Sequence, residues 1–299
     1  MWAIGSHKAK APAPAPSAPV LHLSGAALRR AFGNLVEAAE DTGGVERYVG
    51  ALALKASLFE EVLGKGRVGE LTEAEFCDLA AFITPVRRRI GTWLGRNGFA
   101  AMRGRLEALL CGWSDLGTAD RRLDAFVRSF PADRAHRWPR DLAAEVLHFT
   151  LPDRYPLMTR WMWDARVNTG VVREIWHSDQ DEAGAIAVGD GFATFAVLRE
   201  ELEGFLRDNG VFRDLPFYVD LLCAHIYAGY INDKGGQYLH ADFCGGARND
   251  AMAHTRRMLG LDAVDTESGR TRLKLIDGEA HVLGEVLGEA LGEPRRLSS

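Results

Sequence analysis

The chain is organised around the stretch Glu145-Val-Leu-His-Phe-Thr-Leu-Pro-Asp-Arg-Tyr-Pro-Leu-Met-Thr-Arg-Trp-Met-Trp-Asp164, its most apolar and aromatic run. The first part has apolar residues at helical spacing, namely Val146, Leu147, Phe149 and Leu151. Pro152 ends this pattern, because the residue before a proline is driven out of the α region. The stretch therefore predicts a buried helix that closes near Leu151.

A second helix is expected after the turn, since Pro156 can occupy a first helical position without losing a hydrogen bond. Together the two helices predict a helix–turn–helix corner packed with large side chains. Trp161 and Trp163 are two residues apart, so they cannot share one face of a helix. Either both belong to the core, or one lies on a contact surface, where aromatic residues are enriched. We take Trp161 and Trp163 as candidate partner-binding residues.

Helical periodicity also dominates the rest of the chain. It predicts helices from Ser24 to Gly43, from Val45 to Leu63, after the capping box Thr72-Glu-Ala-Glu75, from Phe99 to Trp113, after Thr118, from Ala193 to Leu206, from Leu215 to Tyr230 and from Asp250 to Leu259. The fold class is therefore mainly α, a multi-helix globular bundle.

Two further segments depart from this pattern. Residues 1–20 carry an Ala/Pro-rich spacer, which predicts a disordered tail. Residues 271–283 alternate around Asp277-Gly278, which predicts a small C-terminal β-hairpin. After the tail we expect an N-terminal helical region at 21–164 and a C-terminal helical region at 165–299, which includes the hairpin, and we expect the two to form one continuous globular body.

Composition narrows the functional classes. The chain has 299 residues, 47% hydrophobic composition and a formal net charge of −5, which does not favour general nucleic-acid binding. No secretory signal and no run of about 20 apolar residues is visible, so a membrane partner is not expected. The four cysteines contain no Cys-x-x-Cys pair. We expect a cytoplasmic protein with free thiols.

Three consecutive arginines, Arg87, Arg88 and Arg89, follow Pro85 in a helical pattern. We expect them on the outside of that helix. They could form a solvated, ion-paired face, or they could bind an acidic partner, because arginine suits interfaces with carboxylates. We include all three among the candidate partner-binding residues.

A candidate metal site lies nearer the C-terminus. Cys223, His225, His240, Asp242 and Cys244 are residue types that bind transition metals. His240, Asp242 and Cys244 are the candidate ligands, but their alternation in a glycine-rich segment matches no zinc spacing. A metal-dependent enzyme around Cys223, His225, His240 and Cys244 remains an alternative. No catalytic motif is present, so we favour a non-catalytic protein and expect no cofactor.

The segment from Leu147 to Leu157 resembles part of the helical proteins related to the helix-hairpin-helix DNA glycosylases. Thr159 stands where that family often has an acidic residue, and the family's glycine hairpin has only a partial counterpart in Leu94-Gly-Arg-Asn-Gly98. Base excision needs a carboxylate beside the flipped base and a positive surface. The resemblance implies a nucleic-acid-binding or repair protein as an alternative function.

The longer stretch from Val146 to Trp176 resembles uncharacterised proteins encoded among nitrogen-fixation genes. Arg160-Trp-Met-Trp-Asp164 and Asn168-Thr-Gly170 carry this second resemblance. It implies a non-catalytic accessory protein whose partner is nitrogenase or an intermediate of nitrogenase assembly or protection. We therefore expect a protein partner rather than nucleic acid.

Overall fold

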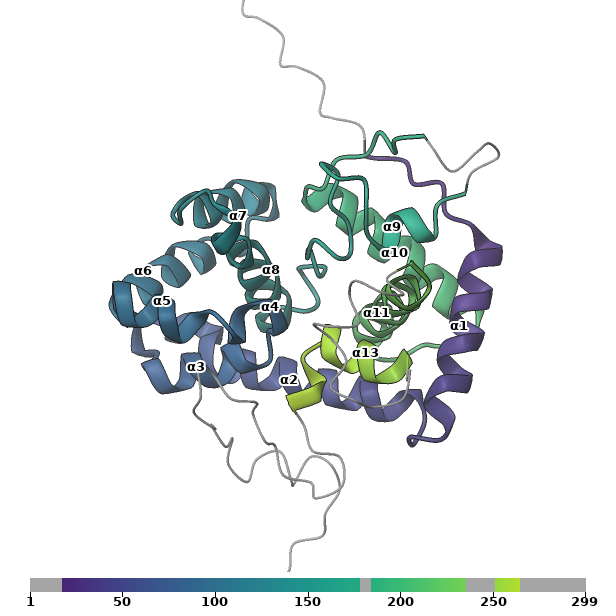
Figure 1. Cartoon of the computed structure of the whole chain (residues 1–299), viewed down its shortest axis with the longest axis horizontal. Helices are drawn as coiled ribbons and strands as arrows, with labels where there is room; N and C mark the ends of the chain where they lie inside the picture. Colours follow the sequence, from purple (N-terminus) through teal and green to yellow (C-terminus); the bar gives the residue numbers. More distant parts are fainter. Residues whose placement is uncertain (1–17, 178–183, 235–250, 264–299) are drawn as a thin grey trace, which may run out of the picture.

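The computed structural model describes residues 18–177, 184–234 and 251–263 (Figure 1). This part of the chain forms twelve α-helices and no strand. They are α1 (Gly25–Glu40), α2 (Val45–Leu63), α3 (Glu73–Ala81), α4 (Thr84–Arg87), α5 (Ile90–Asn97), α6 (Phe99–Leu110), α7 (Ala119–Arg128), α8 (Trp138–Thr150), α9 (Val171–Glu174), α10 (Phe192–Asp208), α11 (Leu215–Lys234) and α13 (Ala251–Met258). The predicted mainly helical class is confirmed.

Local signals set several helix ends. The Ser24 hydroxyl accepts the Ala27 N–H at 3.3 Å and caps α1. Helix α2 has the predicted bounds, and Gly44, with a φ of +83°, precedes its first residue. The capping box at Thr72 and Glu75 is also present, with both reciprocal hydrogen bonds formed. These predictions are confirmed.

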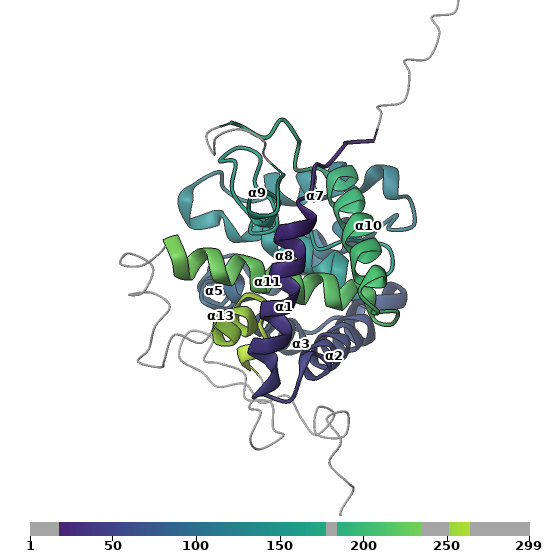
Figure 2. The same ribbon diagram turned by 90° about the vertical axis from the view of Figure 1, so that its right-hand side faces the viewer.

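Helix α8 lies at the centre of the molecule. Every residue of α8 is buried except Arg140, and the helix packs against α2, α4, α6 and α7. Figure 1 shows α3 to α8 on one side and α1, α10, α11 and α13 on the other, with α2 along the base of both. Helix α2 contacts α8 on the first side and α1 and α11 on the second. Figure 2 shows α1 crossing in front of α11, which it contacts.

The predicted helix after Pro156 is wrong. Residues 156–170 form an irregular loop that returns on itself, with Asp164 and Thr169 in an isolated antiparallel bridge. Tyr155 to Thr159 are buried without a break, and the carbonyls of Trp161 and Met162 accept hydrogen bonds from the N–H groups of Val171 and Val172, at 3.0 and 3.2 Å. Backbone hydrogen bonds between the two arms of this loop therefore replace the helical hydrogen bonds that the sequence pattern suggested.

Several expectations fall partly or wholly outside the described residues. The β-hairpin at 271–283 and most of the tail at 1–20 lie there, so they remain predictions. Among the four cysteines, Cys77, Cys111 and Cys223 are described and carry free thiols. None of the described helices combines the length and apolar character that crossing a membrane requires.

Candidate functional site

A cleft of about 850 Å³ opens beside the N-terminal half of α8. Its walls come from the segments around α4, the 3₁₀ turn η3 (Arg134–His136), the loop that carries Trp161, and helices α11 and α13. Arginine is the most frequent residue in its lining, at Arg88, Arg89, Arg134, Arg137, Arg160 and Arg257. A cavity of this size falls within the range of ligand sites in proteins. We call it the arginine cleft.

Four of these arginines form an exposed, uncompensated rim: Arg88, Arg89, Arg134 and Arg137. Within the described residues, none of them has a carboxylate at ion-pair distance. Arg89 donates from Nη1 to the Ala135 carbonyl at 3.5 Å, which brings the two pairs of arginines together. Guanidinium groups without carboxylate partners are suited to bind carboxylates or phosphates of a ligand.

Arg87 does not belong to this rim. The expectation that all three consecutive arginines lie on the outer, solvent-facing side of the helix is therefore wrong. Its side chain is only 2% exposed and donates two hydrogen bonds to Asp262, at 2.7 and 3.0 Å. Helix α4 ends at Arg87, so Arg88 and Arg89 lie in the turn between α4 and α5 rather than on the helix itself. Arg87 joins α4 to the segment after α13, while Arg88 and Arg89 face the cleft.

The two tryptophans of the central stretch also lie in different environments. Trp161 is half-buried, lines the arginine cleft and lies 6.2 Å from the Tyr227 ring, between ring centroids. Trp163 is 0% exposed and donates its indole N–H to the Val188 carbonyl at 3.1 Å. The expectation that Trp163 contacts a partner is therefore wrong, because Trp163 is a core residue. Trp161 and Tyr227 form the aromatic wall of the cleft.

Carboxylates at the bottom of the cleft already have partners within the protein. Asp141 accepts a hydrogen bond from the Arg160 guanidinium at 2.7 Å, and Glu145 accepts one from Lys55 at 2.7 Å. Burial raises the pKa of Glu145 to about 7, against the opposing charge of Lys55. Among the charged groups of the cleft that the structure describes, the rim arginines therefore remain uncompensated, and they make this part of an acidic protein locally positive.

The metal-ligand candidates lie only partly within the described residues. Cys223 is fully buried in the core, where burial raises the pKa of its thiol. His225, two residues further along α11, lies 3.4 Å from the Thr255 hydroxyl. His240, Asp242 and Cys244 lie outside the described residues. Where the chain is described, no three His, Cys, Asp or Glu side chains form a metal-binding group.

Trp161, Arg88 and Arg89 were identified from the sequence, whereas the rest of the site was not. Arg134 and Arg137 form the short basic run Arg134-Ala-His-Arg137, which was the available signal. Tyr227 lies in a long apolar helix and gave no signal of its own. No protein-family model, no curated protein and no solved structure matches this chain. The geometry of the arginine cleft is what supports a functional proposal.

Proposed function

We propose that this protein is a non-catalytic accessory protein that binds an acidic segment of a protein partner in the arginine cleft. One observation carries the proposal: four uncompensated arginines and the Trp161–Tyr227 wall surround a single cavity of about 850 Å³. Arginine and tryptophan are the residue types most enriched in binding hot spots. The rim supplies charge for carboxylates, and the aromatic wall supplies an anchor for an apolar side chain beside them.

The identity of the partner is a further part of the proposal. The resemblance of Val146–Trp176 to proteins encoded among nitrogen-fixation genes makes a nitrogenase component, or a nitrogenase assembly or protection intermediate, the first partner to test. Within the resembling stretch, Arg160, Trp161 and Asp164 line the arginine cleft. The residues that carry the resemblance and those that form the site therefore overlap.

Single-stranded nucleic acid is the second candidate, because bases can stack on tryptophan and tyrosine while arginines bind the phosphates. Two features favour an acidic protein segment instead. Asp141, Glu145 and Asp164 lie in the same lining as the rim arginines, so the cleft suits a segment whose carboxylates are spaced among apolar residues better than a chain with a charge on every unit. The whole protein is acidic, so a long polyanion would meet repulsion beyond the rim.

The direct test is a binding titration with two dye-labelled probes, a peptide that alternates glutamate and leucine and a single-stranded oligonucleotide. We expect the peptide to bind the full chain, and the Arg88→Glu/Arg137→Glu variant to bind it about tenfold more weakly or worse. The Arg96→Glu/Arg121→Glu variant is the matched control, because these exposed arginines change the net charge equally but do not line the cleft.

Each alternative has its own outcome. Tighter binding of the oligonucleotide than of the peptide, with a steep loss at high salt, would favour the nucleic-acid function. Equal losses in the cleft variant and in the control variant would show that net charge alone drives binding. That result would reject the arginine cleft as the site.

A further inference from the structure

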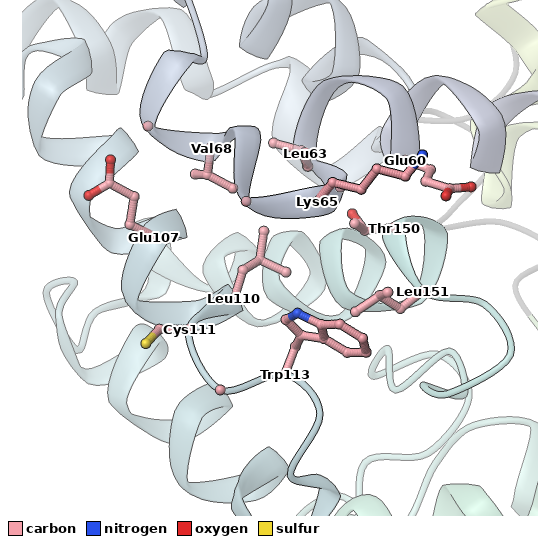
Figure 3. Close-up of a pocket in the computed structure, with 14 residues that line it drawn as sticks. Glu60, Leu63, Lys65, Val68, Glu107, Leu110, Cys111, Trp113, Thr150 and Leu151 are labelled. Atoms are coloured by element: carbon pink, nitrogen blue, oxygen red, sulfur yellow. The ribbon is translucent and has the colours of Figure 1, made fainter.

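A second cavity, of about 630 Å³, lies at the opposite end of α8 from the arginine cleft (Figure 3). Its walls come from the end of α2, the 3₁₀ segment η1 (Gly64–Glu70), the end of α6 and the turn that leads to Trp113. Thr150 and Leu151, the last residue of α8 and the one after it, complete the lining. None of its lining residues belongs to the arginine cleft. We call it the tryptophan pocket.

The Thr150 hydroxyl is the feature that points to a ligand. Thr150 is only 3% exposed, and its Oγ1 is buried without a hydrogen-bond partner in the described part of the chain. A threonine inside a helix commonly bonds the carbonyl four residues earlier, but Thr150 does not. Figure 3 shows its oxygen turned toward the cavity. A buried polar group left unpaired is costly, so a bound molecule that bonds it gains affinity.

The buried part of the rest of the lining is apolar and suits a flat, apolar molecule, while the charged side chains of the lining, Glu60, Lys65 and Glu107, are exposed. Leu63, Leu110 and Leu151 surround the space beside Thr150 (Figure 3). The Trp113 ring forms the floor in this view, with its indole nitrogen on the side of the cavity. Trp113 is 38% exposed, which is unusual for so large an apolar side chain. The Arg154 guanidinium lies 5.0 Å from the ring centroid and holds the ring from outside by a cation–π contact.

The pocket is held open by buried interactions. Arg122 donates to the Tyr155 hydroxyl and to the Leu109 carbonyl, and the Tyr155 hydroxyl in turn donates to the Trp113 carbonyl. Glycines at 64, 66, 69 and 112 form part of the wall, and a Cβ added at Gly66 or Gly112 would meet no atom within 4 Å. Because the turn is anchored and four of the lining residues are glycines, little side-chain ordering is needed in this part of the wall when a ligand enters.

We infer that the tryptophan pocket binds a planar, largely apolar small molecule that carries a hydrogen-bond acceptor, such as a carbonyl oxygen or a ring nitrogen. The ring of the ligand packs between Trp113 and the leucines. The acceptor atom of the ligand accepts a hydrogen bond from the Thr150 hydroxyl. It lies on the side of the cavity that the indole N–H of Trp113 faces. This inference is independent of the proposed function, because it uses a different cavity and different residues.

Two matched probes test the assignment on the full chain by ligand-detected NMR titration. Coumarin is planar and carries a carbonyl acceptor, whereas naphthalene has a similar shape without an acceptor. We expect coumarin to bind more tightly than naphthalene. Thr150→Val should weaken coumarin binding about tenfold and leave naphthalene binding unchanged, because valine keeps the shape and removes the hydroxyl. Trp113→Ala should weaken both probes.

Thr159→Val is the control variant. Thr159 is also buried with a hydroxyl that lacks a hydrogen-bond partner among the described residues, but it does not line this pocket, so coumarin binding should stay at the wild-type value. Far-ultraviolet circular dichroism establishes that each variant is folded. Three results would overturn the inference: no coumarin binding to the wild-type protein, equal affinity for the two probes, or equal coumarin affinity in the wild type and the Thr150→Val variant.

Discussion

The Nζ atom of Lys55 lies 2.7 Å from Oε2 of Glu145 in the core, where the two residues are 1% and 3% exposed. The ammonium also donates to the carbonyls of Phe82 and Leu259, at 3.2 and 2.9 Å, and lies 3.9 Å from the Phe149 ring centroid. This one side chain therefore joins α2 to α8, to the end of α3 and to the end of α13. On the other side of the pair, Glu145 lines the arginine cleft.

Replacing Lys55 by methionine should destabilise the fold strongly. The substitution keeps the length of the side chain but leaves Glu145 and two carbonyls without their donor, a loss of about 3 kcal/mol in the free energy of unfolding. Urea denaturation at pH 8 measures this loss in the free energy of unfolding. Lys65→Met is the control, because Lys65 is exposed, and it should change stability by less than about 0.5 kcal/mol. Equal stability of the two variants would show that the buried pair does not hold these elements together.

The stability of the fold should depend on pH because of the buried carboxyl group of Glu145. Burial raises its pKa from the ordinary value of 4.5 to about 7. Between these values the folded protein keeps a proton that the unfolded chain releases, so the free energy of unfolding falls as pH rises from 4.5 to about 7. The total change is at most about 3 kcal/mol. Urea denaturation across this range should show the slope in the wild type and a smaller slope in Glu145→Gln; identical slopes would contradict this assignment.

The two tryptophans of the central stretch should respond in opposite ways. Trp161→Ala removes the aromatic wall of the arginine cleft, so it should weaken binding of the acidic peptide several-fold while the protein stays folded. Trp163→Phe removes a buried hydrogen bond and some core volume, so it should lower stability by about 1–3 kcal/mol without a direct effect on the cleft. Peptide titration and thermal unfolding of both variants separate these effects. The reverse pattern would show that their assignment is wrong.

Two glycines with similar φ angles should tolerate alanine differently. Gly98 has a φ of +78°, a ψ of 150° and open space where a Cβ would lie, so Gly98→Ala should cost about 1–3 kcal/mol from the backbone alone. Gly260 has a φ of +74°, but a Cβ there would overlap with the Phe82 carbonyl group. Gly260→Ala should therefore cost about 3 kcal/mol or more. Similar unfolding midpoints for the two variants would contradict the close contact at Gly260.

Local sequence signals predicted the parts of the fold that depend on neighbours in the chain. The helix Val45–Leu63, the N-cap at Ser24 and the capping box at Thr72 follow from periodicity and short-range hydrogen bonds, and all three are present. The loop at 156–170 could not be predicted in this way. Its residues are buried by contacts with distant segments, for example Trp163 with Val188.

The candidate site shows the same division. Arg88, Arg89 and Trp161 stood out by composition, but their meeting in one cleft depends on tertiary packing, for example of Arg89 against Ala135, which is 46 residues further along the chain. The inward turn of Arg87 depends on Asp262, which is 175 residues away in the chain. The pair Lys55–Glu145 spans 90 residues and gave no sequence signal. Long-range charge pairing is therefore what local sequence patterns do not reveal.

The central claim, that a partner protein binds the arginine cleft, is tested most directly by affinity capture from native extract. Three tagged full-length proteins are compared at low and high salt: the wild type, the Arg88→Glu/Arg137→Glu cleft variant and the Arg96→Glu/Arg121→Glu control. We predict that one protein is retained in stoichiometric amount by the wild type and the control, and is lost from the cleft variant. Retention of the same partner by all three proteins, or of nucleic acid alone, would contradict this claim.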